Sequence, residues 1–89
     1  MAQIFLKDPD STLDYVIDWS SWLGSDTIAS SSWTVPAGLT MTSESNTTTT
    51  ATVWLSGGSA GSSYQVTNRI TTAAGRVDER SITIEVQER

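Results

Sequence analysis

Alternation of apolar and polar residues is the feature that most constrains the fold of this chain. Segment 13–19 places a large apolar side chain at every second position, namely Leu13, Tyr15, Ile17 and Trp19. A period of two is that of a half-buried strand, and it overrides the three-residue spacing of Trp19 and Trp22 that a helix would favour. No window carries an apolar stripe of helical period over several turns, so we expect an all-β protein. We interpret segment 20–24 as a corner in which Trp22 and Leu23 cap one end of the core.

The same period recurs along the chain, with turn signals roughly every ten residues. Further strands are expected at 3–6, 27–35, 39–42, 49–55, 64–70 and 82–86. Turns are expected at 8–10, 24–26, 36–38, 44–46 and 73–76, with a flexible loop at 56–62. About seven short strands on this spacing predict a single immunoglobulin-like β-sandwich of antiparallel strands, with one core between two sheets. We expect this one domain to cover residues 1–89, because no internal repeat or domain boundary interrupts the pattern.

Residue types that are absent or rare exclude several classes of site. The 89 residues include no cysteine and no histidine, so disulfides, the usual zinc sites and Cys or His nucleophiles are excluded. A net charge of −5 argues against nucleic acid as a partner. No apolar run is long enough to span a membrane, and the start MAQIFLKDPD lacks a signal-peptide pattern, so we expect synthesis in a cytoplasm. Serine and threonine supply 28 residues, which is typical of extracellular or virion β-domains.

Pairs of acidic residues are candidates for catalysis by two carboxylates. Asp14 and Asp18 point the same way from one strand, but at ~3.3 Å per residue they lie about 13 Å apart. A hydrolase needs its two carboxylates closer together across a cleft. Asp78 and Glu79 form the other pair, and no nucleophile motif supports either pair. We therefore predict no catalytic residues and a non-enzymatic protein.

A calcium site is the second chemical hypothesis for the acidic residues. Asp8 and Asp10, with Asp14 or Asp26, could supply oxygen ligands. A proline separates Asp8 from Asp10, and the spacing is unlike that of an EF-hand loop. We expect the two residues to shape a turn through side-chain bonds to backbone N–H groups. No metal and no cofactor are predicted.

The four tryptophans are candidates for contact surfaces. Trp19 and Trp22, flanked by carboxylates, would suit a sugar platform, but the strand pattern assigns both to the scaffold. Trp33 shares a face with apolar residues and is also expected in the core. Trp54 is out of phase with the apolar positions on either side and should point outward. An exposed tryptophan on a strand face often marks an interface, and we favour a protein partner or sister subunit over a sugar.

Two other segments are candidate protein interfaces. Ile4 and Phe5 belong to an N-terminal apolar strand that could pair with another chain. Arg76 and Arg80 lie with acidic residues around a predicted hairpin tip. This tip is either a docking patch or a mixed-charge surface that keeps an edge strand from wrong pairing, and both interpretations stay open. The predicted interface residues are therefore Ile4, Phe5, Trp54, Arg76 and Arg80.

The C-terminal segment GSSYQVTNRITTAAGRVDERSITIEV resembles the last two strands of immunoglobulin-like and fibronectin-type-III-like domains. In such domains a tyrosine at the corner entering the penultimate strand hydrogen-bonds back to the preceding loop. Tyr64 matches that position. The disulfide of antibody domains has no counterpart, and Trp33 is the candidate for their buried tryptophan.

Nearly the whole chain resembles small immunoglobulin-like proteins of tailed bacteriophages and prophages, through KDPDSTLDYVIDW, WLGSDTI, WTVPAGL and NRITTAAGRVDERSITIEV. The resemblance implies a virion protein made in the bacterial host cytoplasm without a signal peptide. We expect a structural role as a capsid decoration or head-fibre component that docks on the major capsid protein or other virion proteins. The alternatives are an adhesion or carbohydrate-binding module of a tail or fibre, and a neck or tail ring protein. Self-association and weak binding to surface glycans fit these roles, whereas nucleic acid and membranes are not expected partners.

Overall fold

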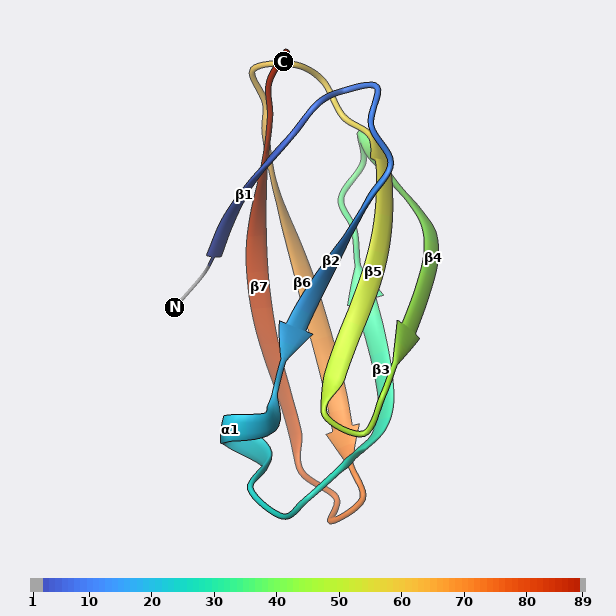
Figure 1. The fold of residues 1–89 in the computed structure, drawn as a ribbon, viewed down its shortest axis with the longest axis vertical. Helices are drawn as coiled ribbons and strands as arrows, with labels where there is room; N and C mark the ends of the chain where they lie inside the picture. The colour runs from blue at the N-terminus through green and yellow to red at the C-terminus, as the bar shows by residue number, and fades with distance from the viewer. Residues whose placement is uncertain (1–2, 89) are drawn as a thin grey trace.

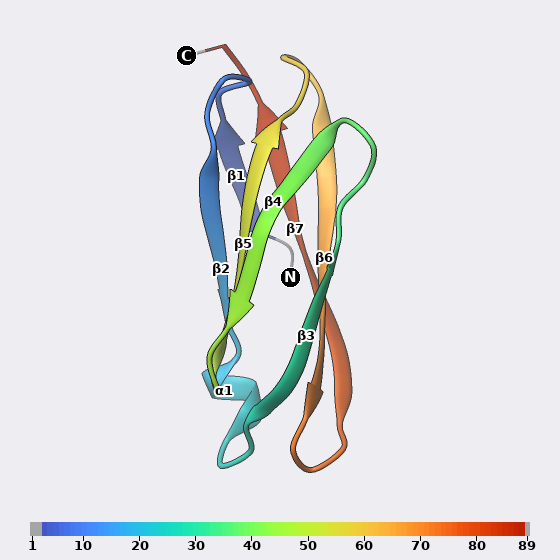
Figure 2. The ribbon, with the colours of Figure 1, turned by 90° about the vertical axis from the view of Figure 1, so that its right-hand side faces the viewer.

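The computed structural model describes residues 3–88 and folds them into seven strands and one turn of helix (Figure 1). In chain order the elements are β1 (Gln3–Lys7), β2 (Leu13–Asp18), α1 (Ser20–Leu23), β3 (Ile28–Thr34), β4 (Leu39–Asn46), β5 (Thr50–Gly57), β6 (Ser63–Thr72) and β7 (Val77–Val86). The strands form a four-stranded sheet in the order β1-β7-β6-β3 and a three-stranded sheet in the order β2-β5-β4. The two sheets stack as the layers of a sandwich (Figure 2). This confirms the predicted all-β immunoglobulin-like fold.

One strand pairing differs from the antiparallel arrangement expected from the sequence. β1 pairs in parallel with β7, with Phe5 opposite Ile84, whereas the other four pairings are antiparallel. No hairpin joins β1 to β7, because the turn after β1 carries the chain into β2 of the other sheet. In that turn the N–H of Asp10 donates to Oδ1 of Asp8 at 2.8 Å, which confirms the side-chain-supported turn predicted there.

The turn predicted at 44–46 is wrong, because β4 continues through this segment to Asn46. The chain turns one step later, around Thr47. The Thr47 hydroxyl accepts hydrogen bonds from the backbone N–H groups of Thr49 at 3.2 Å and Thr50 at 3.0 Å. A threonine hydroxyl can support a turn in this way without glycine or asparagine. The residue that determines this turn is therefore Thr47, the first of the four consecutive threonines at 47–50.

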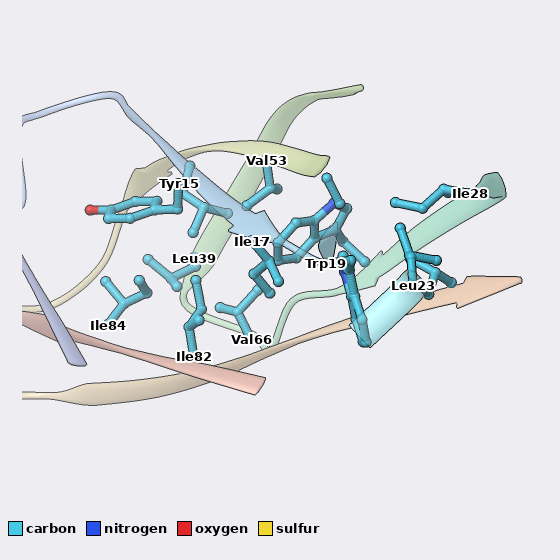
Figure 3. Close-up of a cluster of buried hydrophobic side chains, with 14 of the residues drawn as sticks. Tyr15, Ile17, Trp19, Leu23, Ile28, Leu39, Val53, Val66, Ile82 and Ile84 are labelled. Carbon is cyan, nitrogen blue, oxygen red and sulfur yellow. The ribbon is translucent and has the colours of Figure 1, made fainter. Parts of the chain in front are cut away.

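The core lies between the sheets and uses alternate residues of both (Figure 3). Its buried members are Tyr15, Ile17, Trp19, Leu23, Ile28, Trp33, Leu39, Ala51, Val53, Leu55, Val66, Ile70, Ile82, Ile84 and Val86. Trp19 has no exposed surface, and Leu23 of α1 packs at the same end of the core (Figure 3). This confirms that segment 13–19 is a strand leading into a corner, which the structure forms as the helical turn α1. Within residues 3–88 no helix has the length and apolar character needed to cross a bilayer.

Candidate interface surfaces

Trp54 lies on the outer face of the three-stranded sheet, on its middle strand β5. Val53 and Leu55 point into the core, whereas Trp54 is 40% exposed, which confirms that it points outward. In the strand register Trp54 lies opposite Asp14 of β2 on one side and opposite Ser43 of β4 on the other. Directly opposed residues of an antiparallel pair have Cβ atoms about 5 Å apart, so Asp14 and Trp54 occupy adjacent positions on this face.

Val16 extends the apolar part of this surface. It is 46% exposed and lies diagonally from Trp54, because its own partner is Thr52, two positions along β5. We call this surface the Trp54 face and define it as Asp14, Val16, Ser43, Thr52 and Trp54. Val16 lies between the inward positions Tyr15 and Ile17, so the alternation of the strand assigns it to the outward face. The sequence could not show that Val16 and Asp14 flank Trp54, because that depends on the register between β2 and β5.

β1 presents a second apolar surface, on the four-stranded sheet. Ile4 is 64% exposed and Leu6 is 45% exposed. Phe5, between them, points the other way and packs on the core, with its ring centroid 5.1 Å from that of Tyr15. Of the two N-terminal residues predicted at an interface, Ile4 is therefore on the surface and Phe5 is engaged mainly within the molecule.

Lys7, at the end of β1, is buried between the sheets, although a lysine at a strand end usually indicates an exposed position. Its Nζ donates to the backbone carbonyls of Asp8 at 2.9 Å and Gly57 at 2.7 Å. Burial lowers the pKa of Lys7 from its ordinary value, and the carboxylates of Asp8 and Asp10 partly oppose this shift. The bond to Gly57 ties β1 to the end of β5 in the other sheet.

Arg76, the residue before β7, is held by groups of the α1 corner. Its guanidinium carbon lies 4.2 Å from the ring centroid of Trp22, and its Nε lies 3.1 Å from Oδ2 of Asp26. Its Nη2 also donates to the carbonyl of Leu23 at 3.0 Å. These contacts bind the β6–β7 hairpin to α1 at one end of the sandwich (Figure 1).

Arg80, within β7, makes an equivalent contact with another tryptophan, Trp19. Its guanidinium carbon lies 4.2 Å from the ring centroid of Trp19, and its Nη1 donates to the carbonyl of Asp18 at 3.2 Å. The structure thus gives both predicted interface arginines partners inside the chain. Contact of Arg76 or Arg80 with another protein stays a prediction.

Asp26 is the acceptor at the centre of this corner. The Thr72 hydroxyl, the backbone N–H of Thr27, the Arg76 guanidinium and the backbone N–H of Ala74 bind its carboxylate and hold its pKa at about 2. The Thr27 and Ala74 bonds measure 2.8 and 3.2 Å. Asp26 is therefore ionised at neutral pH and serves to join three segments of the corner.

Tyr64 forms the corner expected from immunoglobulin-like domains. Its hydroxyl accepts a hydrogen bond from the backbone N–H of Ser59 at 3.0 Å, in the loop before β6, which confirms the predicted contact. The ring also packs on Gly38, where an added Cβ would lie 2.7 Å from Cε1 of Tyr64. Tyr64 therefore fixes the β3–β4 and β5–β6 loops against each other.

The acidic residues considered for catalysis or calcium lie in separate places. Asp8 shapes the β1–β2 turn, and Asp26 is bound to Arg76. Asp18 accepts a hydrogen bond from the backbone N–H of Ser20 at 2.9 Å, and this bond lowers its pKa. In the part of the chain that the structure describes, residues 3–88, no three acidic side chains are grouped so as to hold a metal ion.

These observations define the class of protein: an immunoglobulin-like β-sandwich that presents apolar residues on the outer faces of two different sheets. The solution structure of the PKD domain from the KIAA 1837 protein has a similar fold, with a TM-score of 0.58 and 20% sequence identity. The likeness covers 98% of this chain and 80% of that chain, and at this identity it shows the fold alone. A search of curated proteins finds no match.

The particular family follows from the sequence. The model of the family described as "Podophage GP4 fiber-tail adaptor protein gp77" matches residues 7–85, which is most of the chain. The chain belongs to this family. It is therefore a structural protein of the bacteriophage virion, and its partners are other virion proteins. The family match and the fold together confirm the resemblance to small immunoglobulin-like phage proteins.

Proposed function

We propose that this protein joins fibre to tail in a podophage virion. The observation that carries the proposal is the family match over residues 7–85. It favours the tail and fibre alternative over the capsid decoration or head-fibre role expected from the sequence. In this role residues 1–89 act as one domain, and the mechanism is binding without catalysis.

The arrangement of exposed apolar residues suits a connector. The Trp54 face lies on the outer side of the three-stranded sheet, and Ile4 and Leu6 are exposed on the four-stranded sheet. The core separates these two surfaces, so two partners can be bound at once. The molecule exposes 4970 Å² in total, and two contacts of about 800 Å² each would cover roughly a third of it. Repetition around the symmetric tail adds further contacts and strengthens attachment.

Phage particles made without the protein test the proposal. We expect a nonsense mutation in its gene to yield particles with normal heads and tails but without fibres. Quantitative mass spectrometry of wild-type particles should give a small copy number that matches the tail symmetry. Copy numbers on the order of hundreds, with fibres retained on mutant particles, would instead indicate a shell protein and overturn the proposal.

Carbohydrate binding is a second candidate function, favoured by the exposed indole of Trp54 among hydroxyl side chains. An adhesion module of this kind would bind host polysaccharide directly. A pull-down with polysaccharide from the phage host tests it. Binding that is lost in Trp54→Ala would support adhesion, and an absence of binding in the wild-type protein would exclude it for that polysaccharide.

A further inference from the structure

The Trp54 face pairs an exposed indole with an acidic side chain. Asp14 lies directly across the strand pair from Trp54. Within residues 3–88 the recorded ion pairs are Arg69–Glu79 and Arg76–Asp26, so no basic group of this part of the chain is paired with Asp14. The surface therefore offers an aromatic face and a carboxylate to something outside the described chain.

The charge of the whole three-stranded sheet also favours a positively charged partner. Strands β2, β4 and β5 carry three acidic residues, Asp14, Asp18 and Glu44, and no lysine or arginine. Every arginine among residues 3–88 lies on the other sheet or on its β6–β7 hairpin. A partner that covers this sheet gains electrostatic complementarity only if it presents positive charge.

Two contacts inside the molecule show which side chain binds a tryptophan ring and a neighbouring hydrogen-bond acceptor together, and in both it is arginine. Arg76 stacks on Trp22 at 4.2 Å while it pairs with Asp26 at 3.1 Å. Arg80 stacks on Trp19 at 4.2 Å while it donates to a backbone carbonyl of β2. In both cases one guanidinium group lies over an indole ring and also donates to a hydrogen-bond acceptor. Trp54 has a neighbouring acceptor of the same kind and is the exposed tryptophan of the fold.

We propose that the Trp54 face binds an arginine side chain of another virion protein, with the guanidinium stacked on Trp54 and paired with Asp14. This rests on the proposed adaptor function and specifies the chemistry of one of its two contacts. Arginine fits better than lysine, because its planar guanidinium stacks on a ring and donates from its edge at the same time. Val16, beside the pair, would cover the aliphatic part of the arginine side chain and exclude water from the contact.

Photo-crosslinking in assembled virions identifies the partner. Val16 is replaced with the photo-crosslinker p-benzoyl-phenylalanine, which leaves Trp54 and Asp14 intact, and a second phage has the same probe in place of Leu6. Both side chains are exposed, so neither replacement removes a core contact. After irradiation, mass spectrometry maps the crosslinked segments. We expect the probe at Val16 to join a segment of a tail or fibre protein that contains an arginine beside the crosslinked residue.

Different outcomes separate this inference from the adaptor function. A crosslink from Val16 to a tail or fibre segment without arginine would overturn the inference and leave the adaptor function standing. A crosslink from Val16 to a second copy of this chain would also overturn it. Crosslinks from both Val16 and Leu6 to capsid protein alone would overturn the adaptor function. No crosslink from Val16, with one from Leu6 to tail or fibre, would show that the Trp54 face is not an interface.

A model peptide tests the chemistry independently of assembly. The purified protein is titrated with a blocked glycine–arginine–glycine peptide, and the indole N–H signal of Trp54 is followed by NMR. We expect a saturable shift of that signal, and no shift with the citrulline peptide, which has nearly the same shape without the charge. A shift of equal size with citrulline would overturn the inference, as would no shift with arginine at millimolar concentration.

Matched variants assign the charge contribution to Asp14. Asp14→Asn should weaken arginine-peptide binding about threefold, as expected for loss of an exposed ion pair. Glu44→Gln removes the same charge from the same sheet, but Glu44 lies opposite Val53 and not opposite Trp54. It should leave the affinity nearly unchanged. Equal weakening by the two variants would show a general effect of net charge and contradict the specific pairing.

Discussion

The indole N–H of Trp19 donates a hydrogen bond of 2.9 Å to Oδ1 of Asn68 in the interior, where both residues are fully buried. Trp19 follows the last residue of β2, and Asn68 lies on β6 of the other sheet. The Asn68 amide donates onward to the Ser31 hydroxyl at 2.9 Å and the Ser32 carbonyl at 3.0 Å, both on β3. This network joins the two sheets through directional bonds, and its satisfied polar atoms fix how the sheets align.

Loss of Asn68 should be costly, because it leaves the buried Trp19 N–H without a partner. We expect Asn68→Ala to lower the free energy of unfolding by about 2–3 kcal/mol, from the unsatisfied donor and the lost packing. Urea unfolding followed by tryptophan fluorescence measures this. Asn46→Ala, at an exposed position, is the control and should change stability by less than about 0.5 kcal/mol. Similar losses in both variants would contradict a special role for the buried network.

Two tyrosines should respond in opposite ways to loss of the hydroxyl. The Tyr15 hydroxyl is buried and has no hydrogen-bond partner in the described chain, residues 3–88. The Tyr64 hydroxyl accepts the Ser59 N–H. We expect Tyr15→Phe to be neutral or stabilising, and Tyr64→Phe to lose about 1 kcal/mol of stability. Thermal unfolding of the two variants beside the wild type checks this, and a larger loss in Tyr15→Phe than in Tyr64→Phe would refute it.

Acid should weaken the corner around Asp26. The pKa of Asp26 is lowered from 3.8 to about 2 in the folded protein, so the ionised carboxylate stabilises the fold above about pH 4. That contribution is lost as the pH falls from about 4 to about 2, and Asp18, whose pKa is also lowered, acts in the same direction. We expect the melting temperature of Asp26→Asn to fall less than that of the wild type across this interval.

Thr72→Val provides the graded comparison for this acid dependence. The Thr72 hydroxyl makes the largest contribution to the lowered pKa of Asp26. Without this hydroxyl, the melting temperature should fall less on acidification than in the wild type, but more than in Asp26→Asn. A wild-type acid dependence in Asp26→Asn would show that the loss of stability arises at other carboxylates.

The fold was predictable from the sequence because its signals are local. The alternation around Ile17 and the glycine-containing turns show where the strands and corners lie, and the resemblance to immunoglobulin-like domains predicts the role of Tyr64. The direction of β1 was not predictable, because parallel pairing with β7 depends on contacts distant in sequence. The turn at Thr47 was missed because threonine usually indicates strand, and here its hydroxyl supports the turn.

The candidate surface was predictable only in part. The alternation of apolar residues along β5 identifies Trp54 as outward-facing. Its neighbours on the adjacent strands, however, depend on strand register. Asp14 was considered as a catalytic acid, and its position beside Trp54 emerges only when β2 pairs with β5. Arg76 lies 50 residues from its partner Asp26 in the sequence. The sequence therefore does not reveal this ion pair, and Arg76 looks like a free group that could bind another protein. Burial of Lys7 likewise results from the packing of two sheets.

The contact between Gly38 and Tyr64 gives a prediction with an internal control. Gly38 and Gly61 both have positive φ, at +104° and +87°, so alanine is strained at either position. An added Cβ at Gly61 meets nothing within 4 Å, whereas one at Gly38 would lie 2.7 Å from Cε1 of Tyr64. We expect Gly61→Ala to lose about 1–2 kcal/mol of stability from the backbone alone. Gly38→Ala should lose clearly more, because the tyrosine ring must move and its bond to Ser59 is strained or broken.

The same two glycine substitutions, made in Tyr64→Leu protein, show whether the larger loss of stability in Gly38→Ala arises from contact with Tyr64. In Tyr64→Leu protein the ring is absent, so Gly38→Ala and Gly61→Ala should then cost similar amounts of stability in urea unfolding. The difference between the two glycine variants in the wild type, minus that in Tyr64→Leu, measures the coupling between Gly38 and Tyr64. If the difference persists without the ring, the loss at Gly38 comes from the backbone, and Tyr64 does not hold the β3–β4 loop in place.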